Sequence, residues 1–491
     1  MLPKKKKFYI TTPIYYVNSQ PHLGHAYTTI VADMIVRWHR LKGEDVFFLT
    51  GTDEHGEKIQ KAAEQAGKPT GQFVGEISEK FKAAWKSLNI SFDDFIRTTE
   101  KRHEKVVMEF TKTVYDKGDI YKGSYEGLYC YGCENFKTTT ELVNGRCPDH
   151  PTIALEQISE GTYFFRLSKY QKKLLQFFEK NPEFISPVNR REEIINRVKD
   201  GLKDLSITRP KDRVKWGIEF PADKGQVIYV WFEALTNYLT AVEWPKGKKF
   251  KYWPADVHLV GKEIVWFHSV IWPAMLFSAG IEQPKKIFSH GWWTVNGQKM
   301  SKTLGNVVDP VEFSKKYSVD IVRYFLVREI PLGDDGDFSE KALINRINGE
   351  LVADLGNLVY RVLSLVEKFK GRIEGNPQLD KKLNLGKIDG YMEKLELHNA
   401  LAEIWEFIRA TNKYVNENEP WKLQGKDLGN VLYNLLESCR VISILISPFL
   451  PETSEKINKQ LGTKTGALNK CKFTKFSGKI KKGEYLFRKV E

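Results

Sequence analysis

Two histidines near the start of the chain have the surroundings of a phosphate-binding turn. His22 and His25, separated by Leu23 and Gly24, fall between a predicted strand and a predicted helix. The free N–H groups and the dipole of a helix N-terminus favour phosphate, and Gly24 lets a ligand approach the backbone closely. The motif is short, and two histidines in a turn are more often ordinary polar surface.

A second candidate phosphate site is the sequence KMSKT at residues 299–303. It follows a strand-like stretch at residues 292–295 and a predicted turn. Lys299 and Lys302 lie three residues apart on a hydroxyl-bearing loop, where two ammonium groups would neutralise a polyphosphate as point charges. A solvated lysine loop is the alternative for this segment.

Four residues have the spacing of a zinc site. Cys130 and Cys133 form one pair, and Cys147 and His150 form a second pair thirteen residues later. Two residues separate the members of each pair, which is the hairpin spacing of tetrahedral zinc sites. Four protein ligands complete the coordination sphere, so the sequence predicts a structural metal ion.

The pattern of the first 56 residues indicates the scaffold that must position these groups. Residues 8–16 are β-branched and aromatic, as in a strand, and residues 26–41 carry apolar side chains at helical spacing. Residues 46–49 form a short apolar run typical of a parallel sheet, followed by a polar turn at 50–56. Strand, helix and strand open a doubly wound, Rossmann-type α/β domain, in which ligands bind outside the carboxyl ends of the strands.

The α/β pattern is interrupted and then resumes. Residues 117–221 do not follow the α/β pattern, so we expect an insertion there. Strands are predicted again at 227–232 and 257–260, and the second of them leads into a helical segment at 264–277. Beyond about residue 340, amphipathic segments predict a helix bundle, and they span residues 344–369, 385–417 and 428–446.

Five segments follow from these patterns. They are residues 1–116, the first half of the Rossmann domain; 117–225, a connective insertion with the zinc knuckle; 226–290, the second half of the Rossmann domain; 291–342, the segment with the two lysines; and 343–491, an all-helical domain with a basic C-terminal tail.

The composition is that of a globular protein of several domains. The chain has 491 residues, of which 41% are hydrophobic and 28% charged. Five cysteines, an odd number, do not form a secreted disulfide framework, so we expect a reducing, cytoplasmic location. Cys439, on an apolar helix face, and Cys471, in the tail, have no partner that suggests chemistry. The N-terminal lysines precede no apolar signal segment, and residues 441–450 are too few to cross a bilayer.

The charge favours a polyanionic partner. The net charge is +14, and residues 451–491 contain eleven lysines and arginines against four glutamates, which is half of the excess. For this tail, a solvated segment and an RNA contact are equally open.

On a split α/β sheet, HLGH followed by KMSKT is the signature of the class I aminoacyl-tRNA synthetases, and the chain resembles the methionyl-tRNA synthetases of that class. The resemblance covers nearly the whole chain, through TPIYYVNSQPHLGHAY, FLTGTDEHG, YVWFEAL, GKEIVWFHSVIWPAML and HGWWTVNGQKMSKTLGN. Cysteinyl enzymes keep a zinc-binding cysteine on the first strand, whereas no cysteine precedes Cys130 here. The valine, isoleucine and leucine enzymes carry an editing domain that residues 117–221 have no room to hold.

The resemblance implies a role for each of several residues. The catalytic residues would be His22, His25, Lys299 and Lys302. ATP would be bound by His22, Gly24, His25, Gly261, Glu263, Lys299 and Lys302, with Glu263 standing where many relatives have aspartate. Methionine would be bound by Ile14, Tyr16, Asp53, Trp231, Ala234, Tyr238, Ile264, His268 and Trp272. Zinc would be bound by Cys130, Cys133, Cys147 and His150, and the CAU anticodon by Asn357, Arg361 and Trp421.

The residue types in the implied methionine pocket suit that amino acid. Asp53 would pair with the substrate ammonium group. The aromatic rings would contact the polarizable thioether, and each such contact is worth roughly 0.3–1.5 kcal/mol. A branched leucine or isoleucine would clash or leave the slot unfilled. Core packing would be the default explanation of these aromatics without the motifs around them.

The implied anticodon residues also suit their role. Asn357 and Arg361 are four residues apart, so they share one face of a helix. Trp421 would stack on an unpaired base, which is how proteins commonly read single-stranded RNA. A surface asparagine and arginine beside a half-buried tryptophan is the alternative.

The implied enzyme is an ATP-dependent methionine-tRNA ligase that forms AMP and pyrophosphate. The methionine carboxylate attacks the α-phosphorus of Mg-ATP, and the methionyl group then passes to the 3′ end of initiator and elongator tRNA(Met). One structural Zn²⁺ and a Mg²⁺ with ATP are the implied metals. The chain lacks the appended oligonucleotide-binding domain of dimeric relatives, so we expect a monomer, and a separately encoded tRNA-binding partner stays open.

Two other functions fit parts of the sequence. A small-molecule nucleotidyltransferase also uses an H-x-G-H turn, but it needs neither a zinc knuckle nor a helix bundle, and turnover without tRNA would reveal it. A non-catalytic tRNA-binding protein would keep Trp421 and the basic surface, but it should have lost HLGH or the signature lysines, and both motifs are intact.

Lys302→Ala should slow adenylate formation and leave methionine affinity nearly unchanged, because the charge is needed where pyrophosphate departs. Loss of one preorganised stabilising group costs about 10²–10³ in rate. Pre-steady-state measurement of pyrophosphate release checks this, and release at the wild-type rate would remove Lys302 from the reaction.

Overall fold

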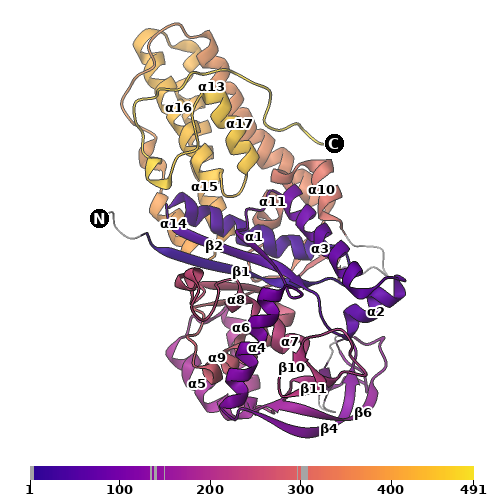
Figure 1. Cartoon of the computed structure of the whole chain (residues 1–491). Coiled ribbons are helices and arrows are strands. Elements are labelled where there is room, and N and C mark those ends of the chain that lie inside the picture. Colours follow the sequence, from indigo (N-terminus) through magenta and orange to yellow (C-terminus); the bar gives the residue numbers. More distant parts are fainter. Residues whose placement is uncertain (1–4, 133–134, 138–140, 149, 296, 300–307) are drawn as a thin grey trace.

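A parallel sheet of six strands lies at the centre of the chain (Figure 1). The computed structural model describes all residues except 1–4, 133–134, 138–140, 149, 296 and 300–307, and it describes the backbone alone of residues 125–126, 135–136, 158–160 and 299. In spatial order the strands are β3 (Asp94–Arg97), β2 (Asp45–Asp53), β1 (Lys7–Tyr16), β12 (Val257–Gly261), β13 (Ile287–His290) and β7 (Ile185–Ser186). The order reverses between β1 and β12, and open α/β sheets bind ligands at such a reversal.

Alternating side chains of the strands build two apolar layers. Phe8 and Ile10 face one side of the sheet, in a core that includes helices α1 (Leu23–Leu41) and α3 (Thr70–Ser87). Tyr9 faces the other side, towards α4 (Lys101–Asp116) and α9 (Trp272–Ala279). Because side chains in a strand point alternately to opposite faces, both faces of the sheet are covered, as in a doubly wound fold.

Three sequence-based boundaries are wrong. Residues 50–53 continue strand β2 instead of forming a turn, because they pair with β1 and Thr50 accepts a 2.8 Å hydrogen bond from Thr12. Helix α1 begins at Leu23, not at residue 26, so His25 lies in its first turn. The run 227–232 is not a strand of the central sheet: it ends the antiparallel strand β11 (Asp223–Ile228) and begins helix α7 (Val230–Ala234). Short apolar runs fit strand and helix equally well.

The segment predicted as an insertion forms two small antiparallel sheets. One has the order β5 (Asn135–Lys137), β4 (Ile120–Cys130), β6 (Glu156–Phe165) and β8 (Leu205–Ser206), and the other has the order β10 (Glu219–Phe220), β11 and β9 (Thr208–Pro210). Helices α5 (Gln171–Lys180) and α6 (Val188–Lys199) lie in sequence between β6 and β8 of the first of these sheets. Strand β7, from the same segment, returns to the central sheet and pairs with β13.

A third small sheet and a long helical region complete the chain. Strand β14 (Trp293–Val295) lies between β15 (Gln298–Lys299) and β16 (Gly336–Phe338). The remaining helices are α2 (Glu57–Gln65), α8 (Asn237–Thr240), α10 (Pro310–Tyr317), α11 (Val319–Arg328), α12 (Glu340–Arg346), α13 (Asn357–Lys368), α14 (Leu385–Glu393), α15 (Leu397–Asn418), α16 (Gly425–Ile446) and α17 (Pro451–Leu461), with the π-helical segments η5 (Phe267–Ile271) and η6 (Ile347–Gly356). As predicted, the described residues beyond 340 contain no strand.

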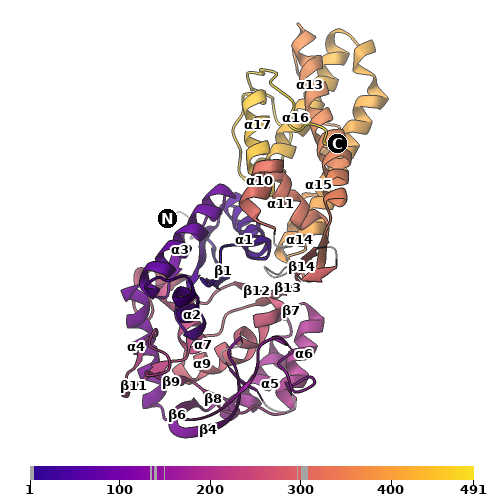
Figure 2. The same ribbon diagram turned by 90° about the vertical axis from the view of Figure 1, so that its right-hand side faces the viewer.

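The helical domain and the two insertion sheets lie at opposite ends of the molecule, with the central sheet between them (Figures 1 and 2). The core of the helical domain is continuous with the face of the sheet that carries α1 and α3. Within the described part of the chain, no helix is long and apolar enough to cross a membrane.

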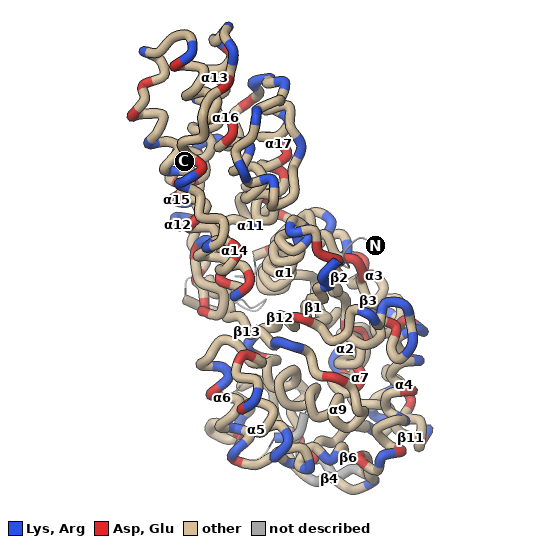
Figure 3. Tube along the Cα trace, turned by 90° about the vertical axis from the view of Figure 1, so that its left-hand side faces the viewer, with Lys and Arg blue, Asp and Glu red and all other residues tan. Residues whose placement is uncertain are grey.

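The C-terminal segment packs on the helical domain. Leu468, Cys471, Leu486 and Phe487 are buried, and a side chain of η6, Asn348, exchanges two hydrogen bonds with the backbone of Val490. Residues 451–491 are therefore not a free solvated tail. Lysine and arginine positions follow the segment past α17 towards the C-terminal end (Figure 3).

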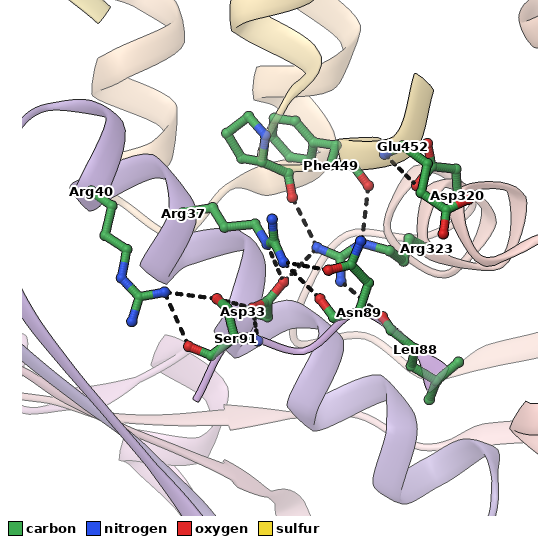
Figure 4. Close-up of polar contacts among 11 residues, drawn as sticks. Asp33, Arg37, Arg40, Leu88, Asn89, Ser91, Asp320, Arg323, Phe449 and Glu452 are labelled. Atoms are coloured by element: carbon green, nitrogen blue, oxygen red, sulfur yellow. Dashed lines mark hydrogen bonds and ion pairs between the residues drawn. The ribbon is translucent and has the colours of Figure 1, made fainter. Parts of the chain in front are cut away.

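One buried arginine joins the helical domain to the sheet domain (Figure 4). Arg323, on α11, donates to the carboxylate of Asp33 on α1 at 2.7 Å. It also donates to the carbonyl oxygens of Phe449 at 3.1 Å and Pro448 at 2.9 Å, just beyond α16, and to that of Leu88 at 3.4 Å, at the end of α3. Both charged side chains are completely buried. A single guanidinium thus connects four segments that are far apart in sequence.

The carboxylate of Asp33 also has several hydrogen-bond donors. Asp33 also accepts from Arg37 at 2.6 Å and from the amide and hydroxyl of Ser91 at 2.7 and 2.6 Å. Burial alone would raise the pKa of Asp33, but Arg323 and Arg37 outweigh it and hold that pKa below its usual value. Asp320, one turn before Arg323, accepts from the amide of Thr453 at 2.6 Å and so caps α17. The interface is therefore fixed by charge-assisted hydrogen bonds as well as by apolar packing.

Arg323→Met should lower the free energy of unfolding by about 3–5 kcal/mol, because it leaves three carbonyl oxygens without their donor and the buried Asp33 carboxylate with Arg37 as its remaining cation. Urea unfolding followed by tryptophan fluorescence measures the change. The double variant Asp33→Leu with Arg323→Met should recover part of the loss, because it removes both buried charges.

The matched control is Arg409→Met on α15, where an arginine with 41% exposure pairs with Glu406. Exposed pairs of this kind contribute about 0.5 kcal/mol or less. If Arg323→Met changed stability no more than this control, the ion pair would not hold the interface together.

Candidate functional site

The two histidines of HLGH form the N-terminal cap of α1. The amide of Gly24 donates to His22 Nδ1 at 3.1 Å, and the amide of His22 donates to His25 Nδ1 at 3.4 Å. The two rings are stacked, with centroids 3.7 Å apart. Because each Nδ1 accepts, the proton of each neutral ring lies on Nε2. Burial, with a smaller effect from His22, holds the pKa of His25 well below its usual value, so that ring is neutral.

Gly24 packs closely against the side chain of its neighbour His22. A Cβ at this position would lie 3.0 Å from the His22 ring, which folds back over the first turn of the helix. The cap and the stacked pair depend on that approach.

The ends of β12 and β13 lie beside the start of α1. His290, the last residue of β13, is 2.7 Å from the hydroxyl of Thr28 on α1. At the end of β12, a Cβ on Gly261 would fall 2.5 Å from the Glu263 carboxylate, so a side chain there would have to displace the end of Glu263. Glu263 is exposed and accepts from the indole N–H of Trp292 at 2.6 Å. The sequence-predicted ATP residues that the structure describes thus come together where the strand order reverses.

The hairpin that leads into the signature lysines lies against the same helix. Trp293 on β14 contacts Tyr27 on α1 edge to face, with ring centroids 5.9 Å apart. Lys299 ends strand β15, paired with Thr294, and its side chain is not described. Lys302 lies outside the described residues, so its position relative to HLGH stays a prediction.

Asp53 and Tyr16 are neighbours at the ends of two adjacent parallel strands. They are register partners in the pairing of β1 with β2, and the Asp53 side chain is buried. Ile14 precedes Tyr16 by two residues and therefore points to the same side of the sheet. An acid, an aromatic ring and an aliphatic side chain are thus brought together at the carboxyl edge.

A chain of ring contacts extends from Tyr16 to the rings of Trp231, Phe267 and His268. Tyr16 meets Trp231 edge to face at 6.3 Å, and Trp231 stacks on Phe267 at 3.9 Å. Trp231 also lies 6.5 Å from the His268 ring, again edge to face. Phe267 is a residue that sequence reasoning missed, although it lies in the quoted stretch GKEIVWFHSVIWPAML.

Hydrogen bonds fix the orientation of His268. Its Nδ1 is 3.0 Å from the carbonyl oxygen of Ile264, and its Nε2 is 2.7 Å from the hydroxyl of Tyr238. Nδ1–H therefore donates to the carbonyl, and Nε2 accepts from the tyrosine. Burial lowers the pKa of His268 to about 4, so the ring is neutral at physiological pH. Trp272 completes this wall, with its ring 6.0 Å from that of Tyr238.

A buried carboxylate behind the pocket was also missed. Glu233, on α7, is bonded to His55 Nδ1 at 3.0 Å and to His103 Nε2 at 2.7 Å. Burial alone would raise the pKa of Glu233, but the two histidines hold it below its usual value. The cluster ties α7, which carries Trp231 and Ala234, to the loop after β2 and to α4. Glu233 and His55 lie in the quoted segments YVWFEAL and FLTGTDEHG and His103 lies outside them, and nothing in their spacing indicates the contact.

Three of the four expected metal ligands meet at one point. The ligand atoms of Cys130, Cys147 and His150 lie within 4.8 Å of one another, with the Cys130 sulfur 3.9 Å from His150 Nδ1. Cys133 lies outside the described residues. A Cβ on Gly132 would come within 2.4 Å of the His150 ring, so the loop after Cys130 needs glycine for His150 to pack against it. Two buried thiols and an imidazole at these separations could hold a tetrahedral metal ion.

The residues predicted to contact an anticodon lie in the helical domain, far from this pocket (Figure 2). Arg361 on α13 donates to the side-chain oxygen of Asn416 on α15 at 2.9 Å. Asn357 is exposed one turn earlier on α13. Trp421 follows the end of α15 and is 56% exposed. The structure therefore places all three at the surface of the helical domain.

Comparison with known proteins identifies the family. The model of the class I tRNA synthetases of type M matches residues 8–158 and 153–363, and the anticodon-binding domain of tRNA ligases matches residues 384–486. A methionine-tRNA ligase of Caldanaerobacter subterraneus is 50% identical over 99% of this chain and 79% of its own length. That of Thermotoga maritima is 47% identical over 99% of this chain and 80% of its own length. The chain belongs to the methionine-tRNA ligase family.

A solved structure agrees with this assignment. Methionyl-tRNA synthetase of Mycobacterium tuberculosis, in complex with methionyl-adenylate, matches with a TM-score of 0.93 and 41% identity over 98% of this chain and 99% of that one. The resemblance inferred from HLGH and KMSKT and the predicted α/β fold with a helical anticodon-binding region are confirmed. The chain is an ATP-dependent aminoacyl-tRNA synthetase, so the two alternative functions do not apply.

Proposed function

We propose that the chain joins methionine to ATP at the carboxyl edge of β1, β2 and β12 and passes the methionyl group to tRNA(Met), initiator and elongator. One observation supports this proposal most directly. At one edge of the sheet, the histidine cap of α1 lies close to Asp53, Tyr16 and Trp231. In-line attack of a carboxylate on a phosphate needs chiefly positioning and charge stabilisation.

Four side chains bind the phosphate groups of ATP. The Nε2–H groups of His22 and His25 donate to phosphate oxygens, at a helix N-terminus that itself favours anions. Lys299 and Lys302 bind the departing pyrophosphate. The ATP ribose lies over Gly261 and Glu263, with Gly24 beside the phosphates. Mg²⁺ enters with ATP and neutralises part of the phosphate charge.

The pocket binds and orients the methionine. Asp53 pairs with the ammonium group of methionine and so orients the carboxylate towards the α-phosphorus. Tyr16, Trp231 and Trp272 offer aromatic surfaces to the thioether, and Ile14, Ala234 and Ile264 fill the remaining wall. His268 and Tyr238 are held neutral and fully bonded, which keeps charge out of the part of the pocket that takes the apolar side chain.

Two bonds are exchanged in sequence. The methionine carboxylate forms a bond to the α-phosphorus as the bond to the bridging oxygen of pyrophosphate breaks. A hydroxyl of the terminal adenosine of tRNA then attacks the methionyl carbonyl carbon, and AMP departs. Neither step needs a covalent bond to the enzyme.

The anticodon CAU is read by Asn357, Arg361 and Trp421. Their exposure on the helical domain supports this role, because hydrogen bonding and stacking require open edges and faces. We further infer that the chain acts as a monomer in the cytoplasm, where a reducing medium keeps the metal-binding thiols available. A separately encoded tRNA-binding partner remains compatible with these roles.

One structural Zn²⁺ would be held by Cys130, Cys147 and His150, with Cys133 as the fourth ligand. The clustering of the three described ligands supports this assignment. Four ligands leave no open position, so the ion would stabilise the loops between β4 and β6 and take no part in catalysis.

Cys147→Ala should lower the zinc content of the purified chain from one ion towards none, since three ligands hold the metal far less tightly than four. Metal analysis after dialysis measures this. Cys471→Ala, which removes a buried cysteine outside the cluster, is the matched control and should retain one zinc. Full zinc content in the Cys147 variant would show that the ligand set is wrong.

Charging of tRNA tests the proposed reaction as a whole. With Mg-ATP and methionine, the chain should form methionyl-tRNA from a tRNA with a CAU anticodon and should charge the same tRNA poorly when the anticodon is changed. Failure to charge the CAU tRNA under these conditions would refute the proposal.

Trp421→Ala should reduce the efficiency of tRNA charging by about ten- to a hundredfold, because stacking of one base on an aromatic ring is worth roughly 1–3 kcal/mol. ATP–pyrophosphate exchange without tRNA should be unaffected, because it does not involve the helical domain. The kcat/KM for tRNA measures the loss.

The variant should also discriminate less against a changed anticodon. Normal charging of CAU tRNA by Trp421→Ala, with undiminished rejection of the changed tRNA, would place the anticodon contact elsewhere on the chain.

A further inference from the structure

Two aromatic side chains are more than half exposed in the part of the chain that the structure describes. They are Trp421, at 56%, and Tyr485, at 55%, and both belong to the helical region. Trp421 is accounted for by the proposed anticodon contact. Tyr485, near the end of the chain, has no role in the function described so far.

Tyr485 is held in place by anchors on both sides. The amides of Lys481 and Gly483 donate to the carbonyl and side-chain oxygens of Gln460 on α17, at 2.8 and 3.1 Å. On the other side, Asn348 donates to the carbonyl of Val490 at 2.7 Å and accepts from its amide at 3.0 Å. Leu486 and Phe487 are buried directly after Tyr485. The backbone is therefore fixed, and the tyrosine is presented outward from it.

The ring of Tyr485 lies flat on a second tyrosine. Its centroid is 4.0 Å from that of Tyr360 on α13, with an angle of 17° between the planes. The ammonium of Lys482 lies 4.3 Å from the centre of the Tyr360 ring. An ordered, exposed aromatic face next to a cation suits a nucleic-acid base and its phosphate, because every base has a π-face and carries a negative backbone.

The pair borders the surface that holds the proposed anticodon residues. Tyr360 and Arg361 follow Asn357 by three and four residues, so each lies beside Asn357 on the surface of α13. Successive helical residues are about 100° apart. Arg361 reaches Asn416 on α15, the helix that ends three residues before Trp421, whereas Tyr360 meets Tyr485 of the C-terminal segment. The two contacts thus leave α13 on opposite sides of Asn357.

The charge of the C-terminal segment fits the same partner. Residues 471–491 contain seven lysines and arginines and two glutamates, and they lie along the surface of the helical domain (Figure 3). An acidic RNA strand running over α13 would meet these cations next to Tyr485.

We propose that Tyr485 is a second stacking platform for an unpaired base of the bound tRNA, placed across Arg361 from Trp421. This inference rests on the proposed anticodon contact and extends it to the C-terminal segment. A loop of RNA would be held between two aromatic rings, with Asn357 and Arg361 reading base edges in the middle.

Four variants of the full chain test this role. Tyr485→Ala and Tyr485→Leu should weaken equilibrium binding of tRNA(Met) about five- to a hundredfold, which corresponds to the loss of one stacked base. Tyr485→Trp should bind within about twofold of wild type. Tyr485→Leu separates stacking from packing, because leucine still covers Tyr360 but offers no π-face to a base. Tyr115→Ala, an exposed tyrosine on α4 far from the helical domain, is the matched control and should leave binding unchanged.

Each outcome has one meaning when the melting temperatures of the variants are measured alongside. If Tyr485→Leu binds tRNA as tightly as wild type, the inference is wrong. It is also wrong if the alanine, leucine and tryptophan variants lose the same amount of tRNA affinity and all melt at a lower temperature, because Tyr485 would then have a purely structural role. If Trp421→Ala weakens tRNA binding and Tyr485→Leu does not, this inference alone fails. If neither variant has an effect, the proposed anticodon surface fails as well.

Discussion

The buried ion pair between Arg323 and Asp33 determines how the two halves of the molecule are joined. Asp33 lies in the middle of α1, the helix that begins with His22 and His25, about 16 Å from that end at 1.5 Å per residue. Arg323 ties it to the turn between α16 and α17 (Figure 4). One helix therefore carries the histidine cap at its start and anchors the helical domain further along. An enzyme that must contact both ends of one tRNA needs such a fixed relation between its domains.

Inside the sheet domain, hydrogen-bonded histidines fix the positions of buried side chains, as the ion pair does at the interface between the domains. His268 is held in one tautomer by Tyr238 and Ile264, so the apolar wall contains polar atoms without exposing charge. Glu233 holds α7 in place through His55 and His103. In the proposed function, selectivity for a thioether depends on the arrangement of these aromatic rings, and buried hydrogen bonds hold that arrangement in place.

The sequence was sufficient for the motifs, the fold class and most of the elements, because HLGH, KMSKT and the apolar periodicities are local. It was not sufficient for residues 227–232, where a short apolar run fits strand and helix alike, or for residues 50–53, whose polar side chains are paired inside a sheet. Contacts such as Arg323 with Asp33 join residues 290 positions apart, and no spacing rule reveals them. The same holds for Tyr485, which looks like part of a solvated tail until it is found stacked on Tyr360.

The central claim is that the pocket bounded by β1, β2, α7 and η5 selects methionine. Amino-acid-dependent ATP–pyrophosphate exchange, measured with each of the twenty amino acids in the absence of tRNA, tests it most directly. Methionine should support exchange, and leucine and isoleucine should be slower in kcat/KM by at least the roughly 10–200-fold that a misfitting apolar side chain costs. Equal exchange with leucine or isoleucine, or none with methionine, would contradict the claim.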